Sequence, residues 1–139
     1  MTLVVVPVRY PLSDHSKKTL SEAIRVSEER GAELTVFHVD LYQDSHNVSI
    51  TDLRGAVERV FGQLDQARYV VRRGFLVEET ILEEVVAERA DIVVIGSKQA
   101  SRWRRMVQKL TSDPDVEAYL RSKLDCTVIT VDADGVANQ

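Results

Sequence analysis

The chain has 139 residues, of which 44% are hydrophobic and 29% are charged, and its formal net charge is -4. This composition is typical of one globular domain and excludes intrinsic disorder, and the small negative charge gives no general attraction to nucleic acids. The single cysteine, Cys126, excludes an internal disulfide and a cysteine-based metal site, and the short, interrupted apolar run at the N-terminus predicts a cytoplasmic protein without membrane contact.

The first half of the chain alternates predicted strands with predicted helices. Residues 3–8, LVVVPV, form a continuous β-branched run typical of a strand that is buried on both faces. A helix follows, with Ser13 or Asp14 as its N-cap and with Gly31 at the left-handed position after its last turn. A second strand is predicted over 33–39, and the next helix is marked by apolar residues at helical spacing, namely Leu53, Ala56, Val57, Val60, Phe61 and Leu64.

The second half repeats this alternation. A strand is predicted over 67–74, and the helix after it should bury one apolar side and expose its glutamates. Strand 91–97 is as apolar as the first strand, a helix is predicted over 114–123, and strand 126–131 ends the pattern. The inward residues of the helix after strand 67–74 are Val77, Ile81, Leu82, Val85 and Val86.

Regular alternation of strands and helices predicts an α/β fold, a single domain over 1–131. We expect an open, parallel, five-stranded sheet with helices on both faces, followed by a flexible tail over 132–139. In such sheets ligands bind beyond the carboxyl ends of the strands, where the strand order reverses. The sequence therefore predicts a crevice formed by the loops after Val8, Val39 and Ile95.

Four segments of the chain match the pattern of a known family. VVPVR with SDHSKKTL resembles its first strand and helix, and ELTVFHV resembles its second strand. VVRRGFLVEETILEEVVAERADIVVIGS matches a strand, a glycine, an acidic helix and a strand that ends in Gly-Ser, and LRSKLDCTVITV resembles the final helix and strand. The likeness spans residues 3–131 and is to the universal stress protein (UspA) family. It implies an adenine nucleotide α-hydrolase-like fold, a stress-linked regulatory role without enzymatic activity, and a homodimer formed through the last strand.

The nucleotide-binding branch of that family holds ATP on a glycine-rich run, G-x-x-G-x9-G-[ST], after the fourth strand. Gly96 and Ser97 match the start of this run, and Val39 matches the adenine side of the site. Gln99 stands at the second glycine, and Arg9 replaces the acid that should end the first strand. The third glycine is also missing, because the two possible alignments place Lys109-Leu110 or Pro114-Asp115 there. The resemblance therefore implies a degraded ATP motif and no bound cofactor.

The segment 98–110 is basic and has helical apolar spacing. Its apolar stripe consists of Trp103, Met106, Val107 and Leu110, and its cations are Lys98, Arg102, Arg104, Arg105 and Lys109. In one interpretation Trp103 anchors a helix whose cations are solvated and partly paired with the acidic helix 76–89. In the other, Lys98, Arg102, Arg105 and Lys109 join Arg9 in binding an anion or an acidic protein partner. The second interpretation predicts a divergent adenine-nucleotide or other anion binder.

Other motifs have structural explanations. The tetrapeptide SDHS at 13–16 favours helix capping over a catalytic relay, and His38 is expected to be a satisfied residue within its strand. No metal motif and no nucleic-acid footprint is present, so we expect no catalytic residues, no metal and no nucleic acid. The last strand is apolar and should lie at the sheet edge, where Cys126, Val128 and Thr130 are the expected dimer contacts.

Overall fold

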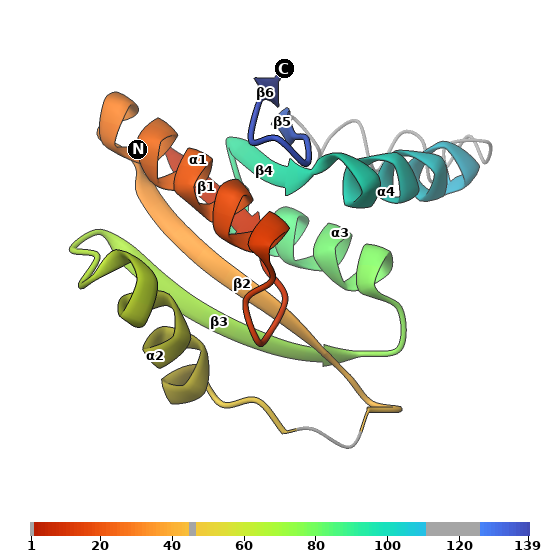
Figure 1. The fold of residues 1–139 in the computed structure, drawn as a ribbon. Helices are drawn as coiled ribbons and strands as arrows, with labels where there is room; N and C mark the ends of the chain where they lie inside the picture. Colours follow the sequence, from red (N-terminus) through yellow and green to blue (C-terminus); the bar gives the residue numbers. More distant parts are fainter. Residues whose placement is uncertain (1, 45–46, 111–125) are drawn as a thin grey trace.

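The computed structural model describes residues 2–44, 47–110 and 126–139 of the chain. In these ranges the strands form one sheet in the order β3-β2-β1-β4-β5-β6, in which β1 to β5 are parallel and β6 is antiparallel to β5 (Figure 1). The strands are β1 (Leu3–Pro7), β2 (Glu33–Leu41), β3 (Ala67–Gly74), β4 (Ile92–Gly96), β5 (Thr127–Val131) and β6 (Ala137–Asn138). The helices are α1 (Asp14–Arg30), α2 (Ile50–Phe61), α3 (Val77–Glu88) and α4 (Ser97–Leu110).

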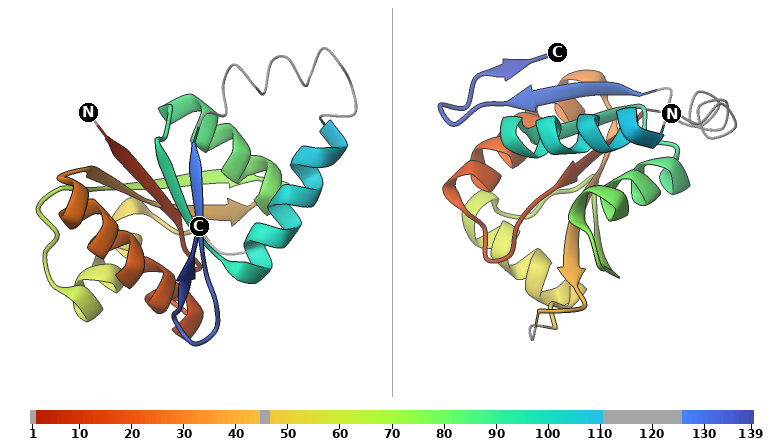
Figure 2. Two further views of the ribbon diagram at one scale, coloured as in Figure 1. Left: turned by 90° about the horizontal axis from the view of Figure 1, so that it is seen from above. Right: turned by 90° about the vertical axis from the view of Figure 1, so that its right-hand side faces the viewer.

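Helices cover both faces of the sheet, α1 and α2 on one side and α3 and α4 on the other (Figure 1 and Figure 2). Strand β1 shows how one segment serves both layers. Val4 and Val6 pack into the core with α1 and α2, whereas Val5 packs into the second core with α3 and α4. Successive side chains of a strand point to opposite faces, so a continuous β-branched run supplies both cores. The predicted α/β architecture is confirmed.

Helix α1 begins and ends where its sequence predicts. Ser13 is the N-cap, and its Oγ accepts a hydrogen bond from the Ser16 N–H at 3.1 Å. Gly31 closes the helix with φ of 60°, in the left-handed region that a glycine adopts without steric cost. Because the capping hydroxyl is occupied by the backbone, the prediction that SDHS caps a helix is confirmed.

Helix α3 differs from its prediction at two of its glutamates. Its glutamates were all expected to face solvent, but Glu84 is only 2% exposed and forms an ion pair with Arg72 of β3. Glu88, one turn further along, pairs with Arg68 of the same strand and accepts a hydrogen bond from the Thr35 hydroxyl. The helix lies over the edge strand β3, whose arginines neutralise these carboxylates, so the inward side of α3 is partly ionic.

The C-terminal residues also differ from their prediction. We expected a sheet of five strands followed by a loose tail over 132–139, but Ala137 and Asn138 form β6 and pair with Val131 and Thr130. Hydrogen bonds inside the turn between β5 and β6 satisfy its backbone groups and let the chain fold back along β5. The predicted helix over 114–123 lies outside the described residues.

The basic segment is helical, as its periodicity predicts. Helix α4 starts directly after β4, and Trp103 is 4% exposed in the core shared with α3. Met106 and Val107 are half-buried against the same core, whereas Arg104 and Arg105 are exposed. Trp103 therefore anchors α4 to the domain, and much of the positive charge of the helix faces solvent.

Candidate functional site

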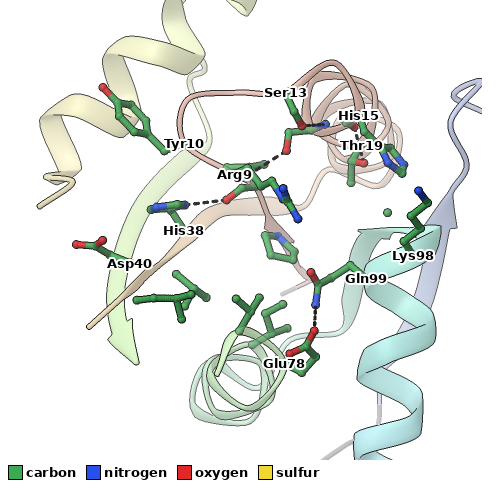
Figure 3. A pocket seen from close by; sticks show the side chains of 18 of the residues that line it. Arg9, Tyr10, Ser13, His15, Thr19, His38, Asp40, Glu78, Lys98 and Gln99 are labelled. Atoms are coloured by element: carbon green, nitrogen blue, oxygen red, sulfur yellow. Dashed lines mark hydrogen bonds between the residues drawn. The ribbon is translucent and has the colours of Figure 1, made fainter. Parts of the chain in front are cut away.

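A cavity of about 880 Å³ lies beyond the carboxyl ends of β1, β2 and β4 (Figure 3). Its walls come from the loop after β1, the start of α1, the end of β2, the first turns of α3 and the junction of β4 with α4. Neighbouring strands β1 and β4 send the chain to opposite faces of the sheet, to α1 and to α4 respectively. The cavity thus occupies the switch point that the sequence predicts.

The loop after β1 forms one wall. Its backbone is held by two side chains, because the Val8 carbonyl accepts a hydrogen bond from His38 Nδ1 at 2.9 Å and the Arg9 N–H donates to Ser16 Oγ at 3.0 Å. Tyr10 contacts the His38 ring edge-on. The Arg9 side chain points into the space between the end of β1 and α4 (Figure 3). His38 is thus satisfied, as predicted, and Arg9 presents its guanidinium to the cavity.

His15 covers the glycine at the junction of β4 with α4. A Cβ atom added at Gly96 would lie 3.0 Å from His15 Cε1 and 3.1 Å from His15 Nε2. The same ring bonds to the last strand of the parallel sheet, with Nε2 donating to the Val131 carbonyl at 2.8 Å. A carbonyl only accepts, so Nε2 carries the proton. The open space that a glycine provides above its backbone is therefore filled by an imidazole.

Glu78 organises the opposite rim of the cavity. Its Oε1 accepts a hydrogen bond from Gln99 Nε2 at 3.1 Å (Figure 3). The same oxygen accepts another from Arg102 Nε at 3.0 Å. The contacts join the first turn of α3 to the first turns of α4, and they neutralise the charge of Arg102. The predicted pairing of the basic segment with the acidic helix is confirmed at this position.

Carboxylates line the β2 side of the cavity. Asp40 is 4% exposed, accepts a hydrogen bond from the Val48 N–H at 3.3 Å and lies 3.8 Å from Arg73 Nε. Asp44 lines the same side. The cations at the ends of β1 and β4 therefore face carboxylates across the crevice, and the site carries both signs of charge.

Most of the residues predicted for the crevice come together there. The cavity is lined by Arg9, Val39, Gly96, Lys98 and Arg102. Ser97, Arg105 and Lys109 do not line it. Ser97 is the first residue of α4, where its carbonyl accepts from Ser101, and the other two lie further along that helix. The residues available for anion binding in the cavity are therefore Arg9 and those in the first turns of α4.

Sequence reasoning did not place His15, Glu78, Tyr10 or Asp40 in the site. The histidine and the glutamate sit on helices whose patterns are explained by capping and by amphipathicity, and no local pattern shows that both helices start at one crevice. Parallel connections bring such distant segments to the same end of the sheet. A search for polar residues near the start of each predicted helix would have found both.

The predicted dimer edge is only partly open. Val128 is half-buried within β5, and Cys126 lies just before that strand and is also half-buried. Thr130 does not have the free edge that was expected, because it pairs with Asn138 of β6 and its hydroxyl donates to the Asn138 carbonyl. Association through the last strand stays a prediction.

Two further features were sought in the described residues. No group of three His, Cys, Asp or Glu side chains within them is arranged to hold a metal ion. No helix in the same part of the chain is long and apolar enough to cross a membrane.

Comparisons with known proteins identify the family. The sequence profile of the universal stress protein family matches residues 1–132, whereas no curated protein matches the chain. One similar solved structure is UspA from Lactobacillus plantarum, with a TM-score of 0.61 and 17% sequence identity over 93% of this chain and 96% of that chain. Another is a universal stress protein family member from Burkholderia pseudomallei, with a TM-score of 0.62 and 14% identity over 94% of this chain and 95% of that chain. A third is a universal stress protein in complex with cAMP, with a TM-score of 0.54 and 15% identity over 91% of this chain and 95% of that chain. This chain belongs to the universal stress protein family.

Proposed function

We propose that this protein is a regulatory binding module without enzymatic activity, and that its crevice does not bind ATP through a glycine-rich phosphate loop. The observation that carries the proposal is the imidazole of His15 above Gly96. Glycine-rich loops bind phosphate because nothing covers their backbone N–H groups. At this junction the His15 ring lies where a Cβ of residue 96 would project, and in our proposal it takes the space that a phosphate on this backbone would need.

The start of α4 supports the same conclusion. The helix begins at Ser97 immediately after β4, so the segment that would form a flexible phosphate loop is already wound into helical turns. Gln99 stands where the second glycine of the family motif belongs, and its amide is held by the Glu78 carboxylate. The same carboxylate pairs with Arg102 and so engages a guanidinium at the cavity rim that could otherwise contact a phosphate.

A binding role also agrees with the hydrogen bonds of the polar groups in the crevice. His15 and His38 each use a ring nitrogen on a backbone carbonyl, and the hydroxyl of Thr19 donates to the His15 carbonyl. Within the described residues, no cavity hydroxyl is hydrogen-bonded to an imidazole nitrogen. A nucleophile activated by a neighbouring base, which hydrolysis by a serine relay requires, is not assembled there.

Calorimetric titration with magnesium ATP tests the proposal. We expect no heat of binding for the wild type, because phosphate contacts at Gly96 are blocked. His15→Ala opens that space and serves as the comparison, and Thr51→Ala, at an exposed position of α2, is the control. A stoichiometric heat for the wild type that His15→Ala leaves unchanged would contradict the reasoning, as would turnover of ATP that a crevice substitution abolishes.

A second candidate function is favoured by two cations of the cavity wall. Arg9 and Lys98 both line the cavity, and within the described residues neither forms an ion pair. A guanidinium and an ammonium can bind a compact anion, such as inorganic phosphate or the phosphate of a mononucleotide, without any glycine loop. The neighbouring structure in complex with cAMP shows that one universal stress protein of this fold accepts a nucleotide with a single phosphate.

Titration with inorganic phosphate and with AMP tests this second candidate. Arg9→Ala should abolish the heat of binding to both, whereas Arg104→Ala, which removes an exposed arginine of α4 outside the cavity, should leave it unchanged. Equal affinity of the wild type and Arg9→Ala would exclude the proposed role of the guanidinium. Binding of AMP but not of phosphate would assign the recognition to the base.

A further inference from the structure

The residues after β5 form a hairpin that is held by several of its own hydrogen bonds. The Asp132 N–H donates to the Val136 carbonyl and the Gly135 N–H to the Asp132 carbonyl, both at 3.0 Å. The Asp132 carboxylate accepts from the N–H groups of Asp134 and Val136, each at 2.9 Å. Gly135 has φ of 86°, which its lack of a Cβ permits. We call residues 131–138 the C-terminal hairpin.

Two side chains of α1 attach this hairpin to the domain. His15 Nε2 donates to the Val131 carbonyl at 2.8 Å, and Lys18 Nζ donates to the Ala133 carbonyl at 2.6 Å. Positions 15 and 18 lie on the same side of a helix, one turn apart. Hydrogen bonds therefore hold the hairpin together internally, and two more attach it to helix α1.

The hairpin covers one part of the sheet edge and leaves another part uncovered. Strand β6 pairs with Thr130 and Val131, whereas Thr127, Val128 and Ile129 have no strand on their outer side within the described residues. A free strand edge is a template for pairing with another chain, and proteins commonly cover such edges. Two of these three residues, Val128 and Ile129, are apolar, and the side chain of Ile129 is buried in the core below the edge.

A second copy of the chain is the partner that fits this edge. Two β5 strands that meet antiparallel about a two-fold axis at Ile129 would pair Thr127 of one copy with Val131 of the other, and Val128 with Thr130. Each copy would need its full outer edge for these pairs. In this register β6 already occupies the outer edge that Thr130 and Val131 would need, so this pairing between copies and the C-terminal hairpin exclude each other.

We propose that the C-terminal hairpin is an intramolecular cap that competes with pairing of β5 between two copies of this protein. His15 and Lys18 latch the cap to α1. His15 also lies against Gly96 in the crevice, so one side chain touches both the candidate binding site and the capped edge. The cap does not depend on what the crevice binds, so its test is independent of the proposed function.

A lockable hairpin provides the decisive experiment. Thr130→Cys and Asn138→Cys, made with Cys126→Ser, place two thiols at opposed positions of an antiparallel pair, where a disulfide can form. The oxidised and the reduced forms of this one variant are compared by sedimentation velocity over a range of concentrations. We expect the oxidised form to stay monomeric and the reduced form to associate, with a dissociation constant at least tenfold lower.

Two further variants keep the test informative. A chain that ends at Asp132 lacks the cap and should dimerise at least tenfold more tightly than the full chain, and Val128→Glu in that truncated chain should restore the monomer. If the truncated chain does not fold, as judged by circular dichroism, His15→Ala with Lys18→Ala replaces it and should shift association in the same direction. Equal association of the oxidised and reduced forms, or no dimer in any unlocked variant, would overturn the proposal.

Discussion

The ion pair beneath α3 provides a quantitative test of how this fold tolerates a buried charge. Glu84 has a side chain 3% exposed, whereas its partner Arg72 is 46% exposed at the sheet edge. Removing one partner of a fully buried pair costs about 3–5 kcal/mol, because the other charge is left without compensation. The exposed guanidinium of Arg72 means that water can enter when it is removed, so the cost falls below the range for a fully buried pair.

We therefore expect Arg72→Ala to lower the free energy of unfolding by about 2–3 kcal/mol. This corresponds to a change in the folding equilibrium constant by a factor of about 30 to 150. Glu84→Gln should lower the free energy of unfolding by less than Arg72→Ala does, since the arginine that it leaves behind can reach water. In the double variant the buried charge is gone, so Glu84→Gln should recover at least half of the loss caused by Arg72→Ala.

Urea unfolding followed by far-UV circular dichroism measures these differences. Arg104→Ala is the matched control, because it truncates an exposed arginine and should change the free energy of unfolding by no more than about 0.5 kcal/mol. If Arg72→Ala costs no more than the control, or if Glu84→Gln brings no recovery, the reasoning from burial is refuted.

Three smaller predictions concern other parts of the domain. Gly96→Ala should displace the His15 ring and lower the free energy of unfolding by about 1–2 kcal/mol. In a chain that already carries His15→Ala, the same substitution should lower it no further. Equal losses in both backgrounds would contradict the contact between Gly96 and His15. Burial raises the pKa of Tyr69, so its phenol should ionise later in the folded chain than in the unfolded one. Stability should then fall as the pH rises above about 10, and Tyr69→Phe should abolish the fall in pH-dependent melting curves. Hydrogen bonds with the Ser49 N–H and hydroxyl lower the pKa of Asp52 in the folded chain. The ionised Asp52 therefore stabilises the fold above its pKa in the unfolded chain, which is about 4, and this stabilisation is lost as the pH falls through its pKa in the folded chain. NMR titration should find the Asp52 pKa closer to its ordinary value in Ser49→Ala.

Local patterns were sufficient for strands β1 to β5, for helices α1 to α4 and for the end of the sheet that carries the site. A continuous β-branched run predicts a strand with helices on both sides, and β1 supplies valines to two cores. Capping residues predict helix ends, and Ser13 and Gly31 do lie there. The departure from the glycine-rich motif at Gln99 and the replacement of the strand-one acid by Arg9 are also visible in the sequence. Each of these inferences depends on residues that are close in the chain, where propensity and periodicity act directly.

The remaining features depend on contacts between distant segments. His15 was explained as part of a helix start, yet its ring lies on Gly96 and bonds to Val131, more than a hundred residues further along. Glu84 was placed on an exposed side because a helical pattern does not show that α3 crosses an edge strand rich in arginines. The tail became a strand because β5 offers it an edge and α1 offers two donors. Periodicity identifies which side of an element is apolar, but the partner of a polar group is set by packing between elements, and a single sequence carries no local signal for it.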